Sequence, residues 1–139
     1  MLIPPGSDGE YAIARRWLHE LAAAVGVTQD RIFLVPGNHD VARAAPGKDR
    51  ALFRLIERLR SGAERLDDAL ADPGDRSLLE NRLHGYREFA SGFAEGCDQL
   101  YWAHRFITVA GQSIPVIGFD TALLANDHLD HGQLWLGKE

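Results

Sequence analysis

The sequence lacks the features of secreted and membrane-spanning proteins. Its 139 residues include one cysteine, Cys97, so no internal disulfide can form, and we expect an intracellular, cytoplasmic location. No apolar run approaches the ~20 residues that a transmembrane helix needs. Residues 1–30 hold no basic stretch followed by an apolar one, as a signal peptide would. We therefore predict no membrane partner.

Basic residues are also few. Lys and Arg total 15 against 20 Asp and Glu, and the net charge is -5. General nucleic-acid binding usually requires a basic face, so we do not expect it here. A nucleotide substrate held by metal ions remains compatible with this charge. With 45% hydrophobic and 25% charged residues, the composition is that of an ordinary folded protein. The length fits one core, so residues 1–139 are predicted to be a single domain.

The first 36 residues predict a helix followed by a strand. Ser7 and Glu10 have the spacing of a capping box, and Gly26 is expected to end the helix. Ile32 to Val35 are apolar and are interpreted as a short buried strand that Pro36 closes. This order favours an α/β fold with a parallel or mixed sheet. The apolar stripe of the helix is Tyr11, Ala14, Leu18, Leu21, Ala22 and Val25.

Residues 45–96 predict helices alone. Apolar residues at helical spacing favour helices at about 49–60, 64–71 and 76–94, and Asp75 is a candidate N-cap for the last. Because nothing here is typical of a strand, we interpret 45–96 as a helical insertion in the single domain. The apolar stripes are Leu52, Leu55, Ile56 and Leu59 in the first helix and Leu79, Leu83, Tyr86, Ala90 and Phe93 in the last.

The later part of the chain predicts a β-hairpin. Two runs with β-type composition, 101–109 and 114–119, are separated by the turn sequence at 110–113. Residues 120–132 are polar and are expected to form a loop. Residues 133–139 are expected to begin a further helix.

The segment Gly37-Asn38-His39-Asp40 places three chemically capable side chains after the predicted strand. Gly37 allows a tight turn with positive φ. The Asn38 amide oxygen is a neutral hard ligand for a divalent metal. The His39 imidazole can bind a metal, donate to a phosphate oxygen or protonate a leaving group. Asp40 can accept a hydrogen bond from the His39 ring and fix its tautomer.

A strand followed by Pro-Gly-Asn-His-Asp resembles the Asn-His motif of the calcineurin-like metallophosphoesterases. The helix and strand of 7–35, and the segments 116–124 and 132–139, are similar to the corresponding units of bacterial members. The resemblance implies a sandwich of two mixed sheets flanked by helices, with two divalent metals of the Mn, Fe, Zn or Mg type that bridge a hydroxide. Asn38 would be a metal ligand, and His39 would be catalytic toward a phosphoester substrate. Asp40 would be catalytic by orienting His39.

The sequence also departs from the family pattern. The Asp-x-His motif has no counterpart, and residues 1–6, where Gly-Asp-x-x is expected, contain no carboxylate. The later His motifs would lie beyond Glu139. One neutral amide cannot hold a divalent ion, because affinity comes from several ligands together. We therefore expect a partial sandwich with little activity alone, the missing ligands being lost, encoded beside the gene or supplied by a complementing chain or oligomer.

Two other functional classes remain open. The chain is alternatively a non-catalytic remnant or interaction module derived from this fold. A nuclease of the same superfamily is less favoured because the chain is not basic.

Other residues are interpreted more simply. Asp120 follows a predicted strand and is a further candidate metal ligand. Residues 127–131 hold two aspartates and two histidines, and a solvated polar loop explains them better than a ligand cluster. Cys97 has no obvious base partner and is interpreted as a packing residue. The tryptophans are predicted to be core residues: Trp17, Trp102 and Trp135.

Overall fold

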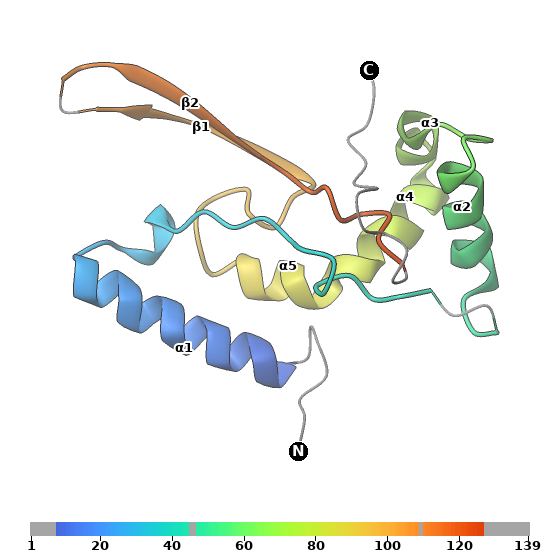
Figure 1. Cartoon of the computed structure of the whole chain (residues 1–139), viewed down its shortest axis with the longest axis horizontal. Helices are drawn as coiled ribbons and strands as arrows, with labels where there is room; N and C mark the ends of the chain where they lie inside the picture. Colours follow the sequence, from blue (N-terminus) through green and yellow to red (C-terminus); the bar gives the residue numbers. More distant parts are fainter. Residues whose placement is uncertain (1–7, 45–46, 109, 127–139) are drawn as a thin grey trace. The chain divides into compact units, whose positions relative to one another are not determined.

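The computed structural model describes residues 8–44, 47–108 and 110–126. These residues form five α-helices, two 3-10 helices and one antiparallel sheet of two strands. The fold is therefore mixed α and β, as predicted. The sheet of the described residues is antiparallel, not the parallel or mixed sheet expected, and the finer prediction of a calcineurin-like sandwich stays a prediction. In chain order the elements are α1 (Asp8–Val25), η1 (Gln29–Arg31), α2 (Arg50–Arg60), α3 (Leu66–Ala71), α4 (Pro73–Glu80), η2 (Asn81–Leu83), α5 (His84–Ala90), β1 (Tyr101–Ile107) and β2 (Ser113–Phe119) (Figure 1).

The chain divides into two compact units, each built from two stretches of sequence. The first unit comprises Met1–Val35 and Gly85–Asp120, and the second comprises Pro36–His84 and Thr121–Glu139. Each unit is described by itself below. The prediction of a single domain with a helical insertion stays a prediction.

In the first unit, helix α1 ends as its sequence predicts. Gly26 adopts a φ of 73°. Its N–H donates to the Ala23 carbonyl oxygen at 3.3 Å, and the Val27 N–H donates to that of Ala22 at 3.0 Å. This pair of bonds is the Schellman motif, which satisfies carbonyl groups in the last turn of a helix. The predicted capping residue, Ser7, lies outside the described residues.

One face of α1 packs against α5. The rings of Tyr11 and Phe89 stack with centroids 4.9 Å apart. The Arg15 guanidinium lies 5.2 Å from the Phe89 ring centroid and donates to the Phe89 carbonyl oxygen at 2.9 Å. Arg15 therefore belongs to the packed face, and its aliphatic stem explains how a charged residue fits there. The predicted stripe is wrong at Leu21 and Val25, which are exposed.

The predicted strand at 32–35 does not form a strand, and its prediction as buried is wrong at Val35, which is 50% exposed. The Leu34 N–H donates to Cys97 Sγ at 3.2 Å. The Trp102 indole N–H donates to the Leu34 carbonyl oxygen at 2.7 Å. Because side chains take these backbone groups, no ladder of backbone bonds forms along the segment.

Strands β1 and β2 form the predicted hairpin. They pair antiparallel, with Trp102 opposite Gly118 and His104 opposite Val116. Gly111 has a φ of 77° in the connecting turn, a conformation that glycine adopts without a steric penalty. The predicted turn at 110–113 is therefore confirmed in part: β1 ends at Ile107 rather than at 109, and Ser113 belongs to β2 rather than to the turn.

One face of the hairpin is aromatic and packed. The Phe33 ring meets the rings of Trp102, His104 and Phe106 at centroid distances of 5.2, 4.7 and 5.0 Å. A Cβ atom at Gly118 would overlap the Trp102 indole ring. Glycine at this position therefore lets the indole lie directly on the neighbouring strand.

The other face of the hairpin is apolar and exposed. Alternation along the strands places Tyr101, Ile117 and Phe119 there, and all three are exposed.

The tryptophan predictions are confirmed only in part. On α1, Trp17 is 60% exposed, so its predicted core position is wrong. Trp102 is buried as predicted. Trp135 lies outside the described residues.

The second unit has an aliphatic helical core. Helix α2 buries the four leucine and isoleucine residues that its sequence predicts. Asp72 caps α4, accepting from the Gly74 and Asp75 N–H groups at 2.8 and 2.9 Å. The predicted cap, Asp75, is therefore wrong. Asp72 precedes Pro73, whose fixed φ and missing N–H suit the first position of a helix.

The predicted helix at 76–94 is broken into α4, η2 and α5, the last of which ends at Ala90. The break changes the phase of the side chains by only about 60°, because three residues of 3-10 helix turn slightly further than three of α-helix. All five predicted core positions are therefore still buried: Leu79, Leu83, Tyr86, Ala90 and Phe93.

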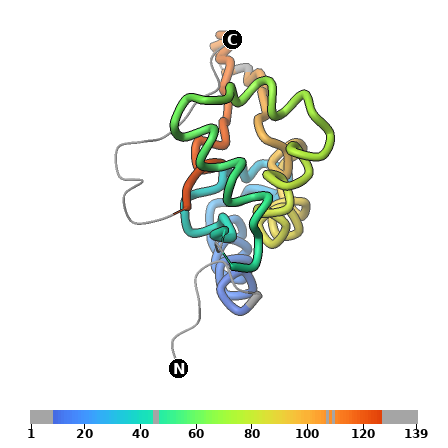
Figure 2. Tube along the Cα trace, turned by 90° about the vertical axis from the view of Figure 1, so that its right-hand side faces the viewer, coloured from blue at the N-terminus to red at the C-terminus, as the bar shows by residue number. Residues whose placement is uncertain are grey.

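Residues 121–126 complete the second unit. The Ala44 N–H donates to Asn126 Oδ1 at 2.8 Å, which holds this late segment beside the chain that precedes α2 (Figure 2). Ala122, Leu123, Leu124 and Ala125 are buried. The prediction that residues 120–132 are polar is therefore wrong at 122–125, which contribute apolar side chains to the core.

Candidate functional site

The Gly37–Asp40 segment, in the second unit, forms a tight turn. The Asp40 N–H donates to the Gly37 carbonyl oxygen at 3.0 Å. In return, the Gly37 N–H donates to Asp40 Oδ2 at 2.8 Å. Asp40 therefore closes the turn with both its backbone and its side chain, as aspartate commonly does in turns. The turn forms without positive φ at Gly37, which corrects that expectation.

Asn38 and His39 are exposed at the tip of this turn. Among the described residues, His39 makes no hydrogen bond, so the predicted bond from its ring to Asp40 is not formed. The Asp40 carboxylate accepts from the Gly37 N–H instead. The turn thus brings the three predicted site residues together in the chain, with Asn38 and His39 accessible to a ligand.

The donor set around the turn does not fit a divalent metal by itself. Within residues 8–44, 47–108 and 110–126, no group of three or more His, Cys, Asp or Glu side chains lies close enough to hold a metal ion. Asn38 contributes one neutral oxygen. Divalent ions of the Mn or Zn type need several charged or imidazole ligands at once. The described residues therefore provide at most one corner of a metal site.

The other candidate ligands lie in other parts of the chain. Asp120 belongs to the first unit, whereas Asn38 belongs to the second. The Asp120 N–H donates to the Leu100 carbonyl oxygen at 2.9 Å, which extends the pairing at the base of the hairpin. The polar loop at 127–131 lies outside the described residues.

Cys97 is a buried packing residue, as predicted. Burial raises the pKa of its thiol, and the hydrogen bond from the Leu34 N–H opposes that shift. Because the thiolate is the nucleophilic form, a raised pKa keeps this residue unreactive at neutral pH.

A buried polar cluster of the second unit is centred on Arg82, which the sequence-based interpretation missed. Arg82 is 3% exposed. Its guanidinium donates to the carbonyl oxygens of Ala42 at 2.9 Å, Leu123 at 2.6 Å and Ala125, and Nη2 lies 3.3 Å from Asn126 Oδ1. A buried arginine needs such acceptors to offset its lost hydration. The Arg82 side chain therefore joins η2 to the segments at 42 and 123–126.

A sequence signal for Arg82 does exist. Arg82 is three residues after Leu79 and four before Tyr86, so it lies on the apolar stripe at helical spacing. A charged residue on a buried stripe indicates a group that must find internal partners. What the sequence does not show is that these partners come from 42 and from 123–126.

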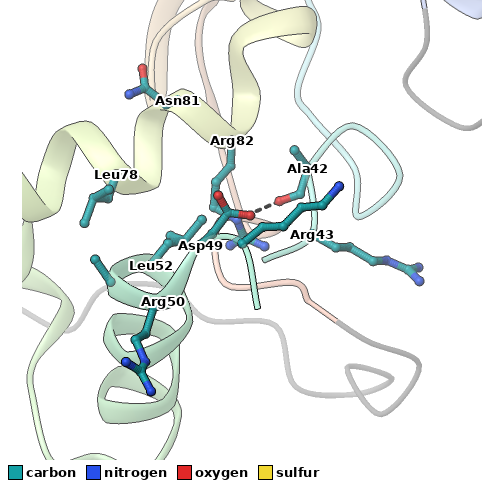
Figure 3. A pocket seen from close by; sticks show the side chains of 10 residues that line it. Ala42, Arg43, Asp49, Arg50, Leu52, Leu78, Asn81 and Arg82 are labelled. Atoms are coloured by element: carbon teal, nitrogen blue, oxygen red, sulfur yellow. Dashed lines mark hydrogen bonds between the residues drawn. The ribbon is translucent and has the colours of Figure 1, made fainter. Parts of the chain in front are cut away.

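A cavity of about 440 Å³ lies beside this cluster in the second unit. Arg82 and Asn81 line it from η2, and Asp49, Arg50 and Leu52 line it from the beginning of α2 (Figure 3). Its volume is within the ~300–1,000 Å³ range of small-molecule sites. No residue of this cavity was among the predicted site residues.

Comparison of the chain with protein-family models, with curated proteins and with solved structures finds no match in any of the three. Among the described residues, no helix is both long enough and apolar enough to cross a membrane.

Proposed function

We propose that this chain carries part of a metal-dependent phosphoesterase of the calcineurin-like type. The observation that supports the proposal is the turn at Gly37–Asp40, which holds Asn38 and His39 exposed side by side. The proposal includes Asn38 as a metal ligand and His39 as the residue that contacts the phosphate. The substrate class is a phosphoester small molecule.

The chemistry assigned to this chain follows from its own side chains. His39 can donate a hydrogen bond to a phosphate oxygen, or a proton to a leaving oxygen, because imidazole exchanges protons near neutral pH. Asn38 offers an oxygen acceptor on the same turn. Asp40 keeps the turn closed through its bond to the Gly37 N–H. Further ligands would be needed before a metal could bind.

A second candidate function is a non-catalytic interaction module. It is favoured by the exposed apolar face of the hairpin, which carries Tyr101, Ile117 and Phe119. Contiguous apolar surface is typical of sites where another protein binds. In this case the complementing chain or oligomer would be the physiological partner, and Asn38 and His39 would have no reactive role.

The DNA beside the reading frame separates the two candidates. Codons for Asp-x-His and Gly-Asp-x-x upstream, with Gly-His-x-His downstream, would supply the missing ligands and support the phosphoesterase. Their absence from both sides would favour the interaction module.

The corresponding activity test uses bis-p-nitrophenyl phosphate with Mn²⁺. We expect negligible hydrolysis by residues 1–139 and measurable hydrolysis by a chain extended with those motifs. In the extended chain, His39→Ala should abolish turnover, whereas His84→Ala, which alters another exposed histidine of the same unit, should retain it. Equal loss in both variants would contradict the role of His39. Turnover by residues 1–139 that His39→Ala abolishes would contradict the expected dependence on further ligands.

A further inference from the structure

The side chains that line the cavity of the second unit are mostly basic, although the chain as a whole is acidic. Four basic residues line it, Arg43, Lys48, Arg50 and Arg82, against one acidic residue, Asp49. The lining therefore has a formal excess of three positive charges in a chain whose net charge is -5. A concave surface of one sign concentrates the field and attracts ligands of the opposite sign.

The basic side chains of the rim are available to a ligand. Arg43, Lys48 and Arg50 are exposed, and none of their side chains forms an ion pair or hydrogen bond with another described residue. Arg82 differs, because its guanidinium is fixed in the wall by carbonyl oxygens. The cavity thus combines one positive charge held by hydrogen bonds with three exposed positive charges.

Uncharged side chains also line the cavity. Leu52 and Leu78 form apolar surface. The Asn81 amide nitrogen donates to Ser77 Oγ at 3.4 Å, and its amide oxygen can accept. At the beginning of α2, the Asp49 side chain makes no capping hydrogen bond, which leaves the first N–H groups of the helix to other acceptors. These features suit an anion attached to a less polar group.

From this combination we infer that the cavity binds a small molecule bearing a diphosphate group. A single phosphate monoester carries about −1.5 to −2 charge at neutral pH, less than the formal excess of the lining. A diphosphate matches that excess more closely, and arginine and lysine are the side chains that bind phosphate most strongly. The volume of about 440 Å³ leaves room for an attached organic group beside Leu52 and Leu78.

This inference does not depend on the proposed phosphoesterase activity. Binding in the cavity requires neither Asn38 nor a metal ion. The two sites are nevertheless close along the chain, because Arg43 follows Asp40 by three residues, which span at most about 11 Å. A ligand held in the cavity would therefore lie near the Gly37–Asp40 turn.

The test is calorimetric titration of the full chain with pyrophosphate, ADP and adenosine in metal-free buffer at low salt. Pyrophosphate and ADP should bind saturably, and adenosine should bind at least tenfold more weakly than ADP. The double variant Lys48→Gln, Arg50→Gln should weaken ADP binding at least tenfold. Equal affinity for adenosine and ADP would overturn the inference, because phosphate would then contribute nothing.

The matched control is the double variant Arg54→Gln, Arg60→Gln. It removes the same number of positive charges, from positions on α2 that do not line the cavity. Its ADP affinity should change less than threefold. Equal weakening by both double variants would show attraction to the general charge of α2 and contradict a built site. Circular dichroism confirms that each variant is folded.

A third variant acts in the opposite direction. Asp49→Asn removes the one carboxylate of the lining and should strengthen ADP binding by about threefold or more at low salt. Unchanged or weaker binding would argue against an anion in the cavity. Because this variant gains affinity, loss of folding cannot imitate its expected result.

Discussion

The two units of the chain differ in how many of their large apolar side chains are exposed to solvent. Among the described residues, eleven large hydrophobic side chains are exposed, and all of them belong to the first unit. Of the largest fully buried side chains, Leu55, Ile56, Leu59 and Leu79 belong to the second unit, and only Cys97 belongs to the first. The second unit therefore buries its own apolar surface, whereas the first leaves much of its apolar surface in water.

The difference in burial follows from the secondary structure of each unit. In the first, the extended segment at 32–35 is held by the side chains of Cys97 and Trp102, and the hairpin has only two strands. A two-stranded hairpin cannot cover both of its faces. In the second, α2 packs an aliphatic face and Arg82 joins the remaining segments. We therefore expect packing to stabilise the second unit more than the first.

The largest expected effect is that of Arg82→Ala. Each buried acceptor that loses its donor costs about 1–3 kcal/mol, so the free energy of unfolding should fall by about 4 kcal/mol. Chemical denaturation measures the loss, and hydrogen exchange should accelerate in the second unit more than in the first. The control, Arg76→Ala, removes an exposed pair with Glu80 and should cost less than about 0.5 kcal/mol. Equal exchange in both units would break the comparison.

The next effect contrasts a buried and an exposed apolar residue. Leu55→Ala should lower the free energy of unfolding by about 3 kcal/mol, because it opens a cavity in the core of the second unit. Ile117→Ala, on the exposed hairpin face, should change it by no more than about 0.5 kcal/mol. Similar losses in the two variants would show that the hairpin face is covered in solution, which sedimentation velocity would then reveal as self-association.

A smaller effect is expected where Gly118 of β2 packs closely against the Trp102 indole ring in the first unit. Gly118→Ala places a methyl group against the Trp102 indole and should destabilise the protein by about 2 kcal/mol. Trp102 fluorescence should change at the same time, because the ring must move. Gly47→Ala is the control, since a Cβ there meets no atom within 4 Å. An unchanged emission spectrum in Gly118→Ala would contradict the packing of the indole on β2.

The smallest effect is a dependence of stability on pH through Cys97. The pKa of its thiol is raised in the folded protein, so the folded state holds the proton more tightly than the unfolded chain. This contribution is complete below the ordinary thiol pKa of ~8.5 and is lost as the pH rises through the folded value. Denaturation between pH 8 and 10 should show a decline that is shallower in Cys97→Ala. Parallel curves would contradict the shift.

The helices could be predicted where their signals are local. The stripe of α2, the glycine that ends α1 and the hairpin at 101–119 all depend on residues close in sequence. The strand at 32–35 could not be judged in this way, because a strand exists only through its partner. The apolar pattern gave the buried side of 79–93 correctly but not the break at η2.

The two candidate sites also differ in whether residues close in sequence determine them. The tight turn at 37–40 follows from its own residues, including the Asp40 carboxylate that closes it. The cavity beside α2 does not, because Arg43, Arg50 and Arg82 come together only when distant segments fold. A motif of adjacent residues is visible in a sequence, whereas a basic cavity assembled from three segments is not.

The hydrogen bonds of Arg82 also set an order of events during synthesis. Its acceptors lie at Ala42 and, some forty residues after it, at Leu123 and Ala125. Contacts between distant residues form late, because a long loop must close first. While the ribosome is still adding those later residues, the guanidinium remains hydrated and the helices α2 to α4 lack their last segment. The second unit therefore completes its folding only after residue 125 has emerged, so its nascent form should be more sensitive to proteases than the finished protein.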